Sequence, residues 1–203
     1  MCSDNVILLN SVASRNREVF EPRVCWFECE PGYISSTSHI VRDFSPYGVD
    51  STSALRNVCR ALQRLGPLGA ERLIRHLHKT QVPFALATSS SARSVETKIA
   101  AHKELFSYFH HMVMGSTDKE VKYGKPHPDI FLVAAARFPD KPDPSKCLVF
   151  EDSPHGVTAG VSAGMQVVMV PDTHLDKRLT THATIVLPTL AKFQPQLFGL
   201  PAF

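Results

Sequence analysis

The sequence predicts an α/β protein in which helices flank a parallel β-sheet. Helical and extended patterns alternate from Gly69 onward, and the extended runs at residues 147–150 and 166–170 are apolar throughout. Continuous apolar runs are typical of strands covered on both faces, and the alternation favours parallel strands joined by right-handed crossovers. Ligands bind such sheets at the carboxyl ends of the strands, so we expect the functional residues there.

The individual elements follow from the spacing of apolar residues. Leu73, Ile74 and Leu77 lie on one face of a predicted helix, and residues 83–88 form a predicted buried strand. The remaining expected elements are, in chain order, a helix over 94–102, a strand over 112–114, a helix over 128–138, strands over 147–150 and 166–170, and a short strand over 184–187.

The composition is that of an ordinary soluble protein. The chain has 203 residues, 43% hydrophobic and 20% charged, and no apolar run approaches the roughly 20 residues that span a bilayer. The net charge of +3 is spread along the chain, and the five cysteines are irregularly placed. These features argue against nucleic-acid binding, a membrane span and a disulfide framework. We expect a monomeric cytoplasmic protein.

The first 66 residues differ from the rest of the chain. They mix short apolar runs with Ser, Asn and Arg in no sustained period, and the composition changes at Gly66-Pro67. We expect a divergent N-terminal segment over residues 1–66, which could supply one strand to the sheet, and a core over residues 67–203.

Polar groups suited to phosphate follow the predicted strand at residues 83–88. Thr88 offers a hydroxyl, and the amides of Ser89 and Ser90 can point at a phosphate where the chain turns. Because charge spreads over the oxygens of a phosphoryl group during its transfer, preorganised donors and cations supply much of the catalysis. The alternative is that these residues cap the following helix.

Two further polar segments are candidates for the same site. Lys125, between Gly124 and Pro126, could place its ammonium beside a phosphate; the alternative is an ordinary surface lysine. Glu151 and Asp152 follow an apolar strand, where adjacent carboxylates favour a cation such as Mg²⁺; the alternative is an exposed strand end. Together the segments predict a magnesium-dependent phosphate site.

Three longer phrases carry a resemblance to a known family. They are Gly-Lys-Pro-His-Pro-Asp-Ile-Phe-Leu at residues 124–132, Leu-Val-Phe-Glu-Asp-Ser-Pro at 148–154 and Ala-Gly-Met-Gln-Val-Val-Met-Val-Pro at 163–171. The stretch from Leu68 to Phe203 resembles the haloacid dehalogenase superfamily, in particular its pseudouridine-5'-phosphatase-like group. This resemblance implies a Rossmann-like core and hydrolysis of a small phosphorylated metabolite, such as a modified nucleoside 5'-monophosphate.

The resemblance also implies a role for each candidate residue. Thr88 and Ser89 would bind the phosphate, and Lys125 would lie beside the phosphate and the attacking carboxylate. Asp152 would bind Mg²⁺ directly, and Glu151 would bind it through water.

The family mechanism requires an Asp-x-Asp motif, which this sequence lacks. In the family the first aspartate attacks phosphorus and the second handles the leaving-group proton. The nearest match is residues 39–46, in which Asp43 would be the nucleophile, but Ser45 replaces the acid/base and Pro46 replaces a glycine. Chance similarity explains this match about as well. Loss of acid–base assistance alone costs about 10²–10⁴-fold in rate.

The resemblance raises two structural questions. Relatives insert a helical cap before the Thr88 strand, and the residues between Asp50 and Leu68 are too few for one, so we expect the cap domain to be missing. The nucleophile strand lies mid-sheet in the family, and its loss would leave unpaired backbone groups that cost about 1 kcal/mol or more each. Another segment should fill this slot: residues 39–44 first, 6–9 second and 24–27 third.

Three functional hypotheses remain open. The first is a degenerate phosphatase homologue that keeps a phosphate- and magnesium-binding half-site and has weak or no activity. The second is an active, capless, Mg²⁺-dependent phosphatase that uses Asp43. The third is a non-catalytic binding or scaffold protein.

Overall fold

The computed structural model describes residues 8–9, 23–26 and 67–203 of the chain. The strands are β1 (Leu8–Leu9), β2 (Arg23–Trp26), β3 (Phe84–Thr88), β4 (Met112–Met114), β5 (Cys147–Glu151), β6 (Gln166–Met169) and β7 (Ile185–Val186). The α-helices are α2 (Pro67–Lys79), α3 (Ala92–Ile99), α4 (Lys103–Phe106), α5 (Asp129–Ala136) and α6 (Pro154–Ser162). Short 3₁₀ turns lie at Ala100–His102, Pro144–Lys146, Lys177–Leu179, Leu190–Lys192 and Pro195–Phe198.

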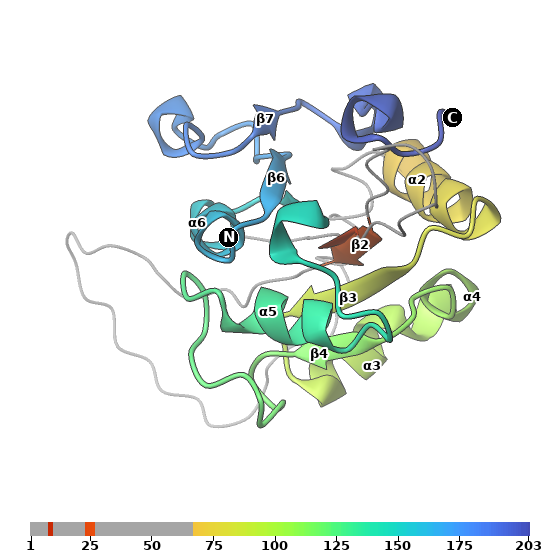
Figure 1. Ribbon diagram of the computed structural model, residues 1–203, viewed down its shortest axis with the longest axis vertical. Coiled ribbons are helices and arrows are strands. Elements are labelled where there is room, and N and C mark those ends of the chain that lie inside the picture. The colour runs from red at the N-terminus through yellow and green to blue at the C-terminus, as the bar shows by residue number, and fades with distance from the viewer. Residues whose placement is uncertain (1–7, 10–22, 27–66) are drawn as a thin grey trace, which may run out of the picture.

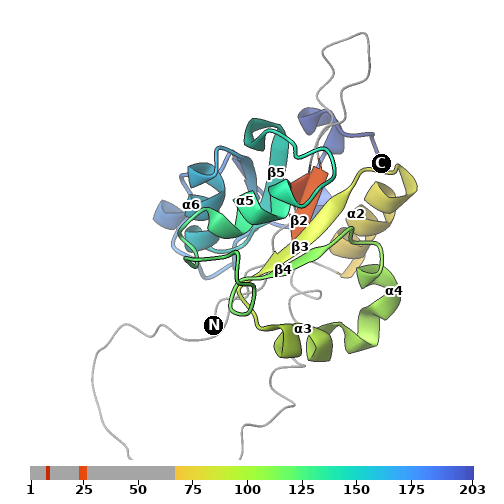
Figure 2. The ribbon, with the colours of Figure 1, turned by 60° about the horizontal axis from the view of Figure 1, so that its bottom comes forward.

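The strands form one sheet whose central part is parallel. Its order is β4–β3–β2–β5–β6–β7, and each neighbouring pair along this path is parallel. The sheet lies between α2 and α4 on one side and α5 and α6 on the other (Figures 1 and 2). Because the strands are parallel, their carboxyl ends meet at one edge.

The slot between β3 and β5 is filled from the N-terminal part of the chain. Val24 of β2 pairs with Phe84 of β3 and with Leu148 of β5, both in the parallel sense. β1 pairs antiparallel with the same two strands. β1 and β2 therefore have the same two strands as partners.

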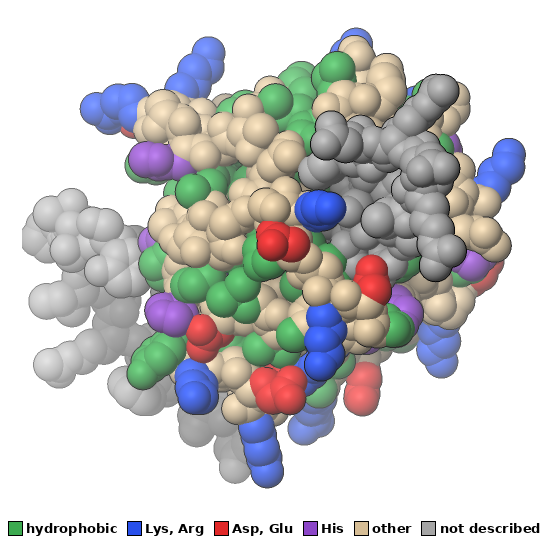
Figure 3. Space-filling model, viewed as in Figure 1, with side chains coloured by type: hydrophobic (Ala, Val, Ile, Leu, Met, Phe, Trp, Pro, Cys, Tyr) green, Lys and Arg blue, Asp and Glu red, His purple; other side chains and the backbone are tan. Residues whose placement is uncertain are grey.

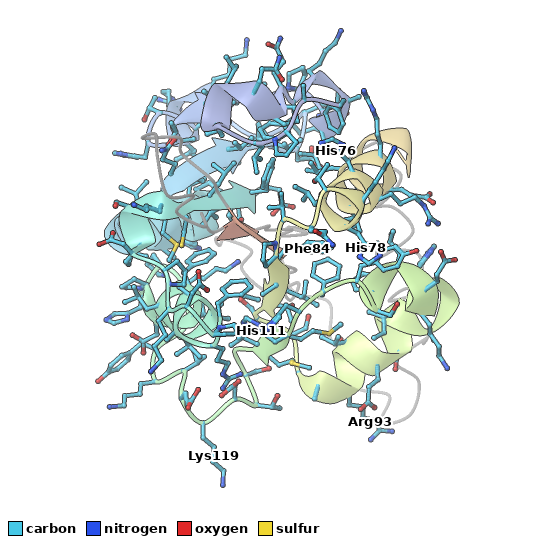
Figure 4. The ribbon with its side chains drawn as sticks, turned by 45° about the vertical axis from the view of Figure 1, so that its right-hand side comes forward. His76, His78, Phe84, Arg93, His111 and Lys119 are labelled. Atoms are coloured by element: carbon cyan, nitrogen blue, oxygen red, sulfur yellow. The ribbon has the colours of Figure 1, made fainter. Side chains whose placement is uncertain are left out.

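Strand residues alternate between two apolar cores, one on each face of the sheet. Phe84 and Leu148 pack toward α2, whereas Ala85 and Val149 pack toward α5 and α6. Figure 4 shows Phe84 pointing from β3 into the interior. Its ring lies 4.7 Å from the ring of Phe109. Burial on both faces accounts for the apolar runs in the sequence.

The predicted elements from residue 67 onward are confirmed, with small shifts of their ends. β5 continues one residue further than predicted, through Glu151, and the single helix predicted over 94–102 is instead α3 followed by a 3₁₀ turn. Ser153 caps α6, and Gly164 after this helix has φ of 79°. None of the described helices is long and apolar enough to cross a bilayer.

The ranking of segments for the central slot is wrong in part. The third candidate, residues 24–27, overlaps β2, and the second, residues 6–9, contains β1. The first candidate, residues 39–44, lies outside the described residues. The Val-Cys-Trp run has the β-branched and aromatic residues that favour strands, whereas Arg42 and Asp43 in the first candidate do not.

Candidate phosphate and metal site

The candidate site lies at the edge where β3 and β5 end. Thr88 is the last residue of β3 and Glu151 the last residue of β5. β2 lies between these strands, so a spacing of ~4.8 Å per strand places the two ends about 10 Å apart. The loop between β4 and α5 reaches the same edge with Lys125, whose Nζ contacts Glu151.

The β3 end forms a turn that leads into α3. Thr88 is 1% exposed, and its Oγ1 accepts a hydrogen bond from the Ser90 amide at 3.1 Å. The cap of α3 is Ser91, whose Oγ accepts from the Ser94 amide at 3.3 Å. The helix-capping alternative therefore applies to Ser91 and not to Thr88. Ser89, half-buried, lies in the turn between them.

The loop that carries Lys125 is held by the first residue of α5. Asp129 Oδ2 accepts hydrogen bonds from the amides of Lys122 and Tyr123, each at 3.0 Å. Its Oδ1 lies 2.8 Å from His127 Nδ1. Burial acts to raise the pKa of Asp129, but these amides and His127 outweigh it and hold the pKa below its ordinary value. The Lys125–Pro126 peptide bond in this loop is cis.

Arg137, directly after α5, forms ion pairs with two acidic residues in the earlier part of the same loop. Arg137 Nη1 lies 2.6 Å from Asp118 Oδ2, and its Nη2 lies 2.5 Å from Glu120 Oε2. The hydrogen bond from Arg137 lowers the pKa of Asp118, although burial opposes the shift. The loop therefore has two anchors on the α5 side of the sheet.

Glu151 and Lys125 form a buried ion pair. Lys125 Nζ lies 2.5 Å from Glu151 Oε1, and the two side chains are 3% and 0% exposed. The other oxygen, Oε2, accepts from the Asp152 amide at 3.0 Å and from the amide and hydroxyl of Ser153 at 3.1 and 3.3 Å. Lys125 Nζ also lies 5.9 Å from the centre of the Phe131 ring.

The carboxylate of Glu151 lies under the first turn of α6. Ser153 caps this helix by accepting from the Gly156 amide at 3.0 Å, and Pro154 opens it. A Cβ placed on Gly156 would come 1.6 Å from Glu151 Oε1. Glycine at this position therefore leaves the space that the carboxylate occupies.

Asp152 fits a metal better than its neighbour does. It is half-buried directly after β5, and a carboxylate oxygen is the ligand that Mg²⁺ prefers. The Glu151 carboxylate faces the lysine and the amides instead. Among the described residues, no group of three or more His, Cys, Asp or Glu side chains gathers where it could hold an ion.

The predicted residues thus fall into three sets. Lys125, Glu151 and Asp152 are brought together, and Thr88 lies at the end of a strand two positions away in the same sheet. Asp43 lies outside the described residues. The sequence analysis also did not identify Gly156. A glycine in the first turn of a helix that follows two carboxylates can indicate that a carboxylate packs against that turn.

A further signal lies in the sequence after β2. This strand fills the slot in which the family places its nucleophile, and the chain continues from it as Phe27-Glu28-Cys29-Glu30. Two carboxylic residues therefore follow the central strand with the spacing of an Asp-x-Asp motif. These four residues lie outside the described part of the chain.

The buried lysine, the adjacent carboxylates and the hydroxyl-bearing turn thus lie at the carboxyl edge of a parallel sheet, where α/β proteins bind their ligands. The chain belongs to the haloacid dehalogenase-like hydrolases, because the model of that family matches residues 26–164, more than half of its length.

Comparisons with individual proteins agree with this family. The chain is 68% identical over 135 residues to a probable pseudouridine-5'-phosphatase of Drosophila melanogaster, covering 66% of this chain and 58% of the relative. It is 52% identical over 136 residues to the mitochondrial (DL)-glycerol-3-phosphatase 1 of Arabidopsis thaliana, covering 66% and 45%. The chain thus spans about half the length of these curated relatives.

A solved structure with the same fold is the HAD family hydrolase of Deinococcus radiodurans R1, which contains bound phosphate and sodium. It is 27% identical to this chain with a TM-score of 0.54, over 64% of this chain and 57% of the other. The predicted Rossmann-like fold and the family resemblance are therefore confirmed, whereas the missing cap domain stays a prediction.

Proposed function

We propose that the chain keeps the phosphate- and magnesium-binding half of a phosphatase site and has weak or no turnover. The observation that carries this proposal is the buried ion pair of Lys125 and Glu151 beside Asp152. A lysine that is 3% exposed at the functional edge of a parallel sheet needs an anionic partner, and a phosphate can share it with the carboxylate.

Each group has a role in holding a phosphomonoester. The Lys125 ammonium would face the phosphate oxygens, while the Thr88 hydroxyl and the Ser89 amide would donate from the β3 side. The Ser90 amide donates to Thr88 Oγ1 instead. Asp152 would hold Mg²⁺, and the bound ion would neutralise charge on the phosphoryl oxygens. The bonds that close the Thr88 turn and the Lys125 loop hold these donors in place before a ligand arrives.

The proposal of weak turnover rests on the sequence. No Asp-x-Asp motif is present, and Ser45 cannot serve as a carboxylic acid/base in the match around Asp43. The short span before Leu68 supports a missing cap domain, which would leave the site open to water and reduce selectivity. We keep residues 1–66 and 67–203 as the proposed division of the chain.

The active alternative gains support from the position of β2. Glu28 and Glu30 follow this central strand in the sequence, and the family match itself begins at Trp26. Glutamate carboxylates serve as nucleophiles in other hydrolases. Glu28 is therefore a second candidate nucleophile besides Asp43.

The substrate class follows from the relatives and the surface. Their names refer to small phosphorylated compounds, pseudouridine 5'-phosphate and glycerol 3-phosphate, so a small phosphorylated metabolite is the proposed ligand. Basic and acidic side chains are interspersed on the face in Figure 3, which supports the proposal that nucleic acid is not a partner. A cytoplasmic monomer remains our proposal.

Hydrolysis of p-nitrophenyl phosphate with Mg²⁺ tests this function. We expect little or no turnover by the wild-type chain and measurable binding of inorganic phosphate. Turnover that disappears in Asp43→Asn or in Glu28→Gln would identify the nucleophile and establish the active alternative. A folded chain that binds neither phosphate nor Mg²⁺ would establish the scaffold hypothesis instead.

A further inference from the structure

We propose that Glu151 is a positioning residue that holds Lys125 and the start of α6, and that it is not a magnesium ligand. This inference rests on the proposed phosphate site, and it departs from the role that the sequence pattern predicts for Glu151. Its basis is the set of contacts around the carboxylate, the charge of those contacts and the space under α6.

The acceptor sites of the carboxylate are already in use. An ionised carboxylate offers about four lone-pair positions. Oε1 contacts Lys125 Nζ, and Oε2 accepts from the Asp152 amide and from the amide and hydroxyl of Ser153. A metal ion or its bound water would have to displace one of these donors. The Lys125 side chain is 3% exposed and Ser153 is 6% exposed, so a donor displaced from either would lose a hydrogen bond without regaining water.

The charge around Glu151 also opposes a metal. One partner is a full ammonium, and the others lie at the N-terminal end of α6, where the helix dipole is positive. A carboxylate is stabilised by these surroundings, whereas a divalent cation in contact with it would meet the lysine at close range.

Space leads to the same conclusion. Mg²⁺ keeps several waters in an octahedral shell with metal–oxygen distances of about 2.1 Å. The Glu151 side chain is 0% exposed, and its Oε1 lies so close to Gly156 that even a methyl group there would overlap it. Asp152 is half-buried and has better access to a hydrated ion.

The consequence for the site concerns the lysine. A lysine side chain has a flexible four-carbon stem, so an unanchored ammonium samples many positions. Glu151 fixes Nζ at the strand edge, and Gly156 allows the carboxylate to reach it from below α6. Donors fixed before binding avoid reorganisation when the charged ligand arrives.

Two neutralising variants at adjacent positions test the metal part of this inference. Calorimetric titration with Mg²⁺ should show binding weakened about tenfold or more in Asp152→Asn and changed less than about threefold in Glu151→Gln. Equal weakening in both variants would overturn the inference. Absence of Mg²⁺ binding in the wild-type chain would contradict the proposed function. The positioning role of Glu151 is then tested by the phosphate titration and the double-mutant cycle.

Titration with inorganic phosphate separates positioning from simple electrostatics. Glu151→Gln removes a negative charge, which by itself should tighten phosphate binding. If Glu151 positions Lys125, the same variant should instead weaken binding about tenfold, because the ammonium is no longer held. Unchanged or tighter binding in a folded variant would overturn the positioning role. If the wild-type chain binds no phosphate, the proposed function fails.

A double-mutant cycle gives a readout that needs no ligand. Urea midpoints are compared for Lys125→Met, Glu151→Gln and the double variant. The double variant should be more stable than Lys125→Met alone, because the single change leaves a buried carboxylate unpaired. Additive losses would show that the two side chains are not coupled and would overturn the inference.

Discussion

The ends of β3 and β5 are built alike and serve different purposes. Each strand ends in a polar residue, turns, and enters a helix through a serine cap, Ser91 for α3 and Ser153 for α6. At β3 the last strand residue is Thr88, a neutral hydroxyl bonded to its own turn. At β5 it is Glu151, a carboxylate that fills the space under the helix and binds Lys125.

The same local arrangement, a strand end followed by a serine-capped helix, thus has a different electrostatic environment at β3 and at β5. A helix N-terminus attracts anions, and at α6 the anion is part of the protein. The β3 turn has no such carboxylate in its last strand residue, so the Thr88 hydroxyl and the Ser89 amide suit an external anion. The phosphate is therefore expected on the β3 side of Lys125, and the metal at Asp152.

Removal of the lysine should have the largest effect on stability. Lys125→Met leaves the Glu151 carboxylate buried without its ion-pair partner, and breaking such a pair costs about 3–5 kcal/mol. Lys122→Met, an exposed lysine of the same loop, should change stability by less than about 0.5 kcal/mol. Urea unfolding compares the two. Equal losses of stability in the two variants would show that the buried Glu151 carboxylate does not require the Lys125 ammonium.

Addition of one methyl group under α6 should have the next largest effect. Gly156→Ala forces the Glu151 carboxylate away from its donors, and we expect a loss of about 2–3 kcal/mol in the free energy of unfolding. Gly124→Ala is the control, because a Cβ there meets nothing within 4 Å. Chemical denaturation measures both. An unchanged free energy of unfolding in Gly156→Ala would contradict the packing of the Glu151 carboxylate against this helix.

On the β3 side the expected effect is smaller and concerns the ligand more than the fold. Thr88→Val removes the acceptor of the Ser90 amide, which should cost about 1–2 kcal/mol, and weakens phosphate binding about tenfold. Thr97→Val, whose hydroxyl donates to Arg93 on the exposed surface of α3, should leave phosphate binding unchanged. Equal phosphate affinity in wild type and Thr88→Val would show that the Thr88 hydroxyl does not bind phosphate.

The two helix caps provide the finest comparison. Ser91→Ala removes an N-cap and should cost about 1 kcal/mol. Ser153→Ala removes a cap and also a donor to Glu151 Oε2, so its loss should exceed that of Ser91→Ala. Thermal and urea unfolding of both variants measure the difference. Identical losses would show that the Ser153 hydroxyl acts on the helix alone.

The sequence predicted the fold well because apolar patterning determines which strands are buried. β3, β4 and β5 were located from their apolar runs, and Lys125, Glu151 and Asp152 from the polar residues next to strands. The contact between Lys125 and Glu151 was not predicted, because it joins the loop before α5 to the end of β5, and only the crossovers bring these two segments together. Spacing along the chain contains no information about that contact.

The N-terminal strand shows a second limit. Residues 39–44 were ranked first for the central slot because of their outline of a motif, whereas β2 (Arg23–Trp26) pairs with both neighbours. A damaged motif is weak evidence, and the Val-Cys-Trp run has the stronger strand preference. Strand preference was the better guide because a central strand must first satisfy backbone pairing and burial.

The most direct test of the account is a phosphorus NMR titration of the full chain with inorganic phosphate in the presence of Mg²⁺. The account predicts saturable binding to the wild-type chain and an affinity lowered about tenfold or more in folded Lys125→Met. Equal affinity in the two proteins, or no binding by the folded wild-type chain, would contradict it.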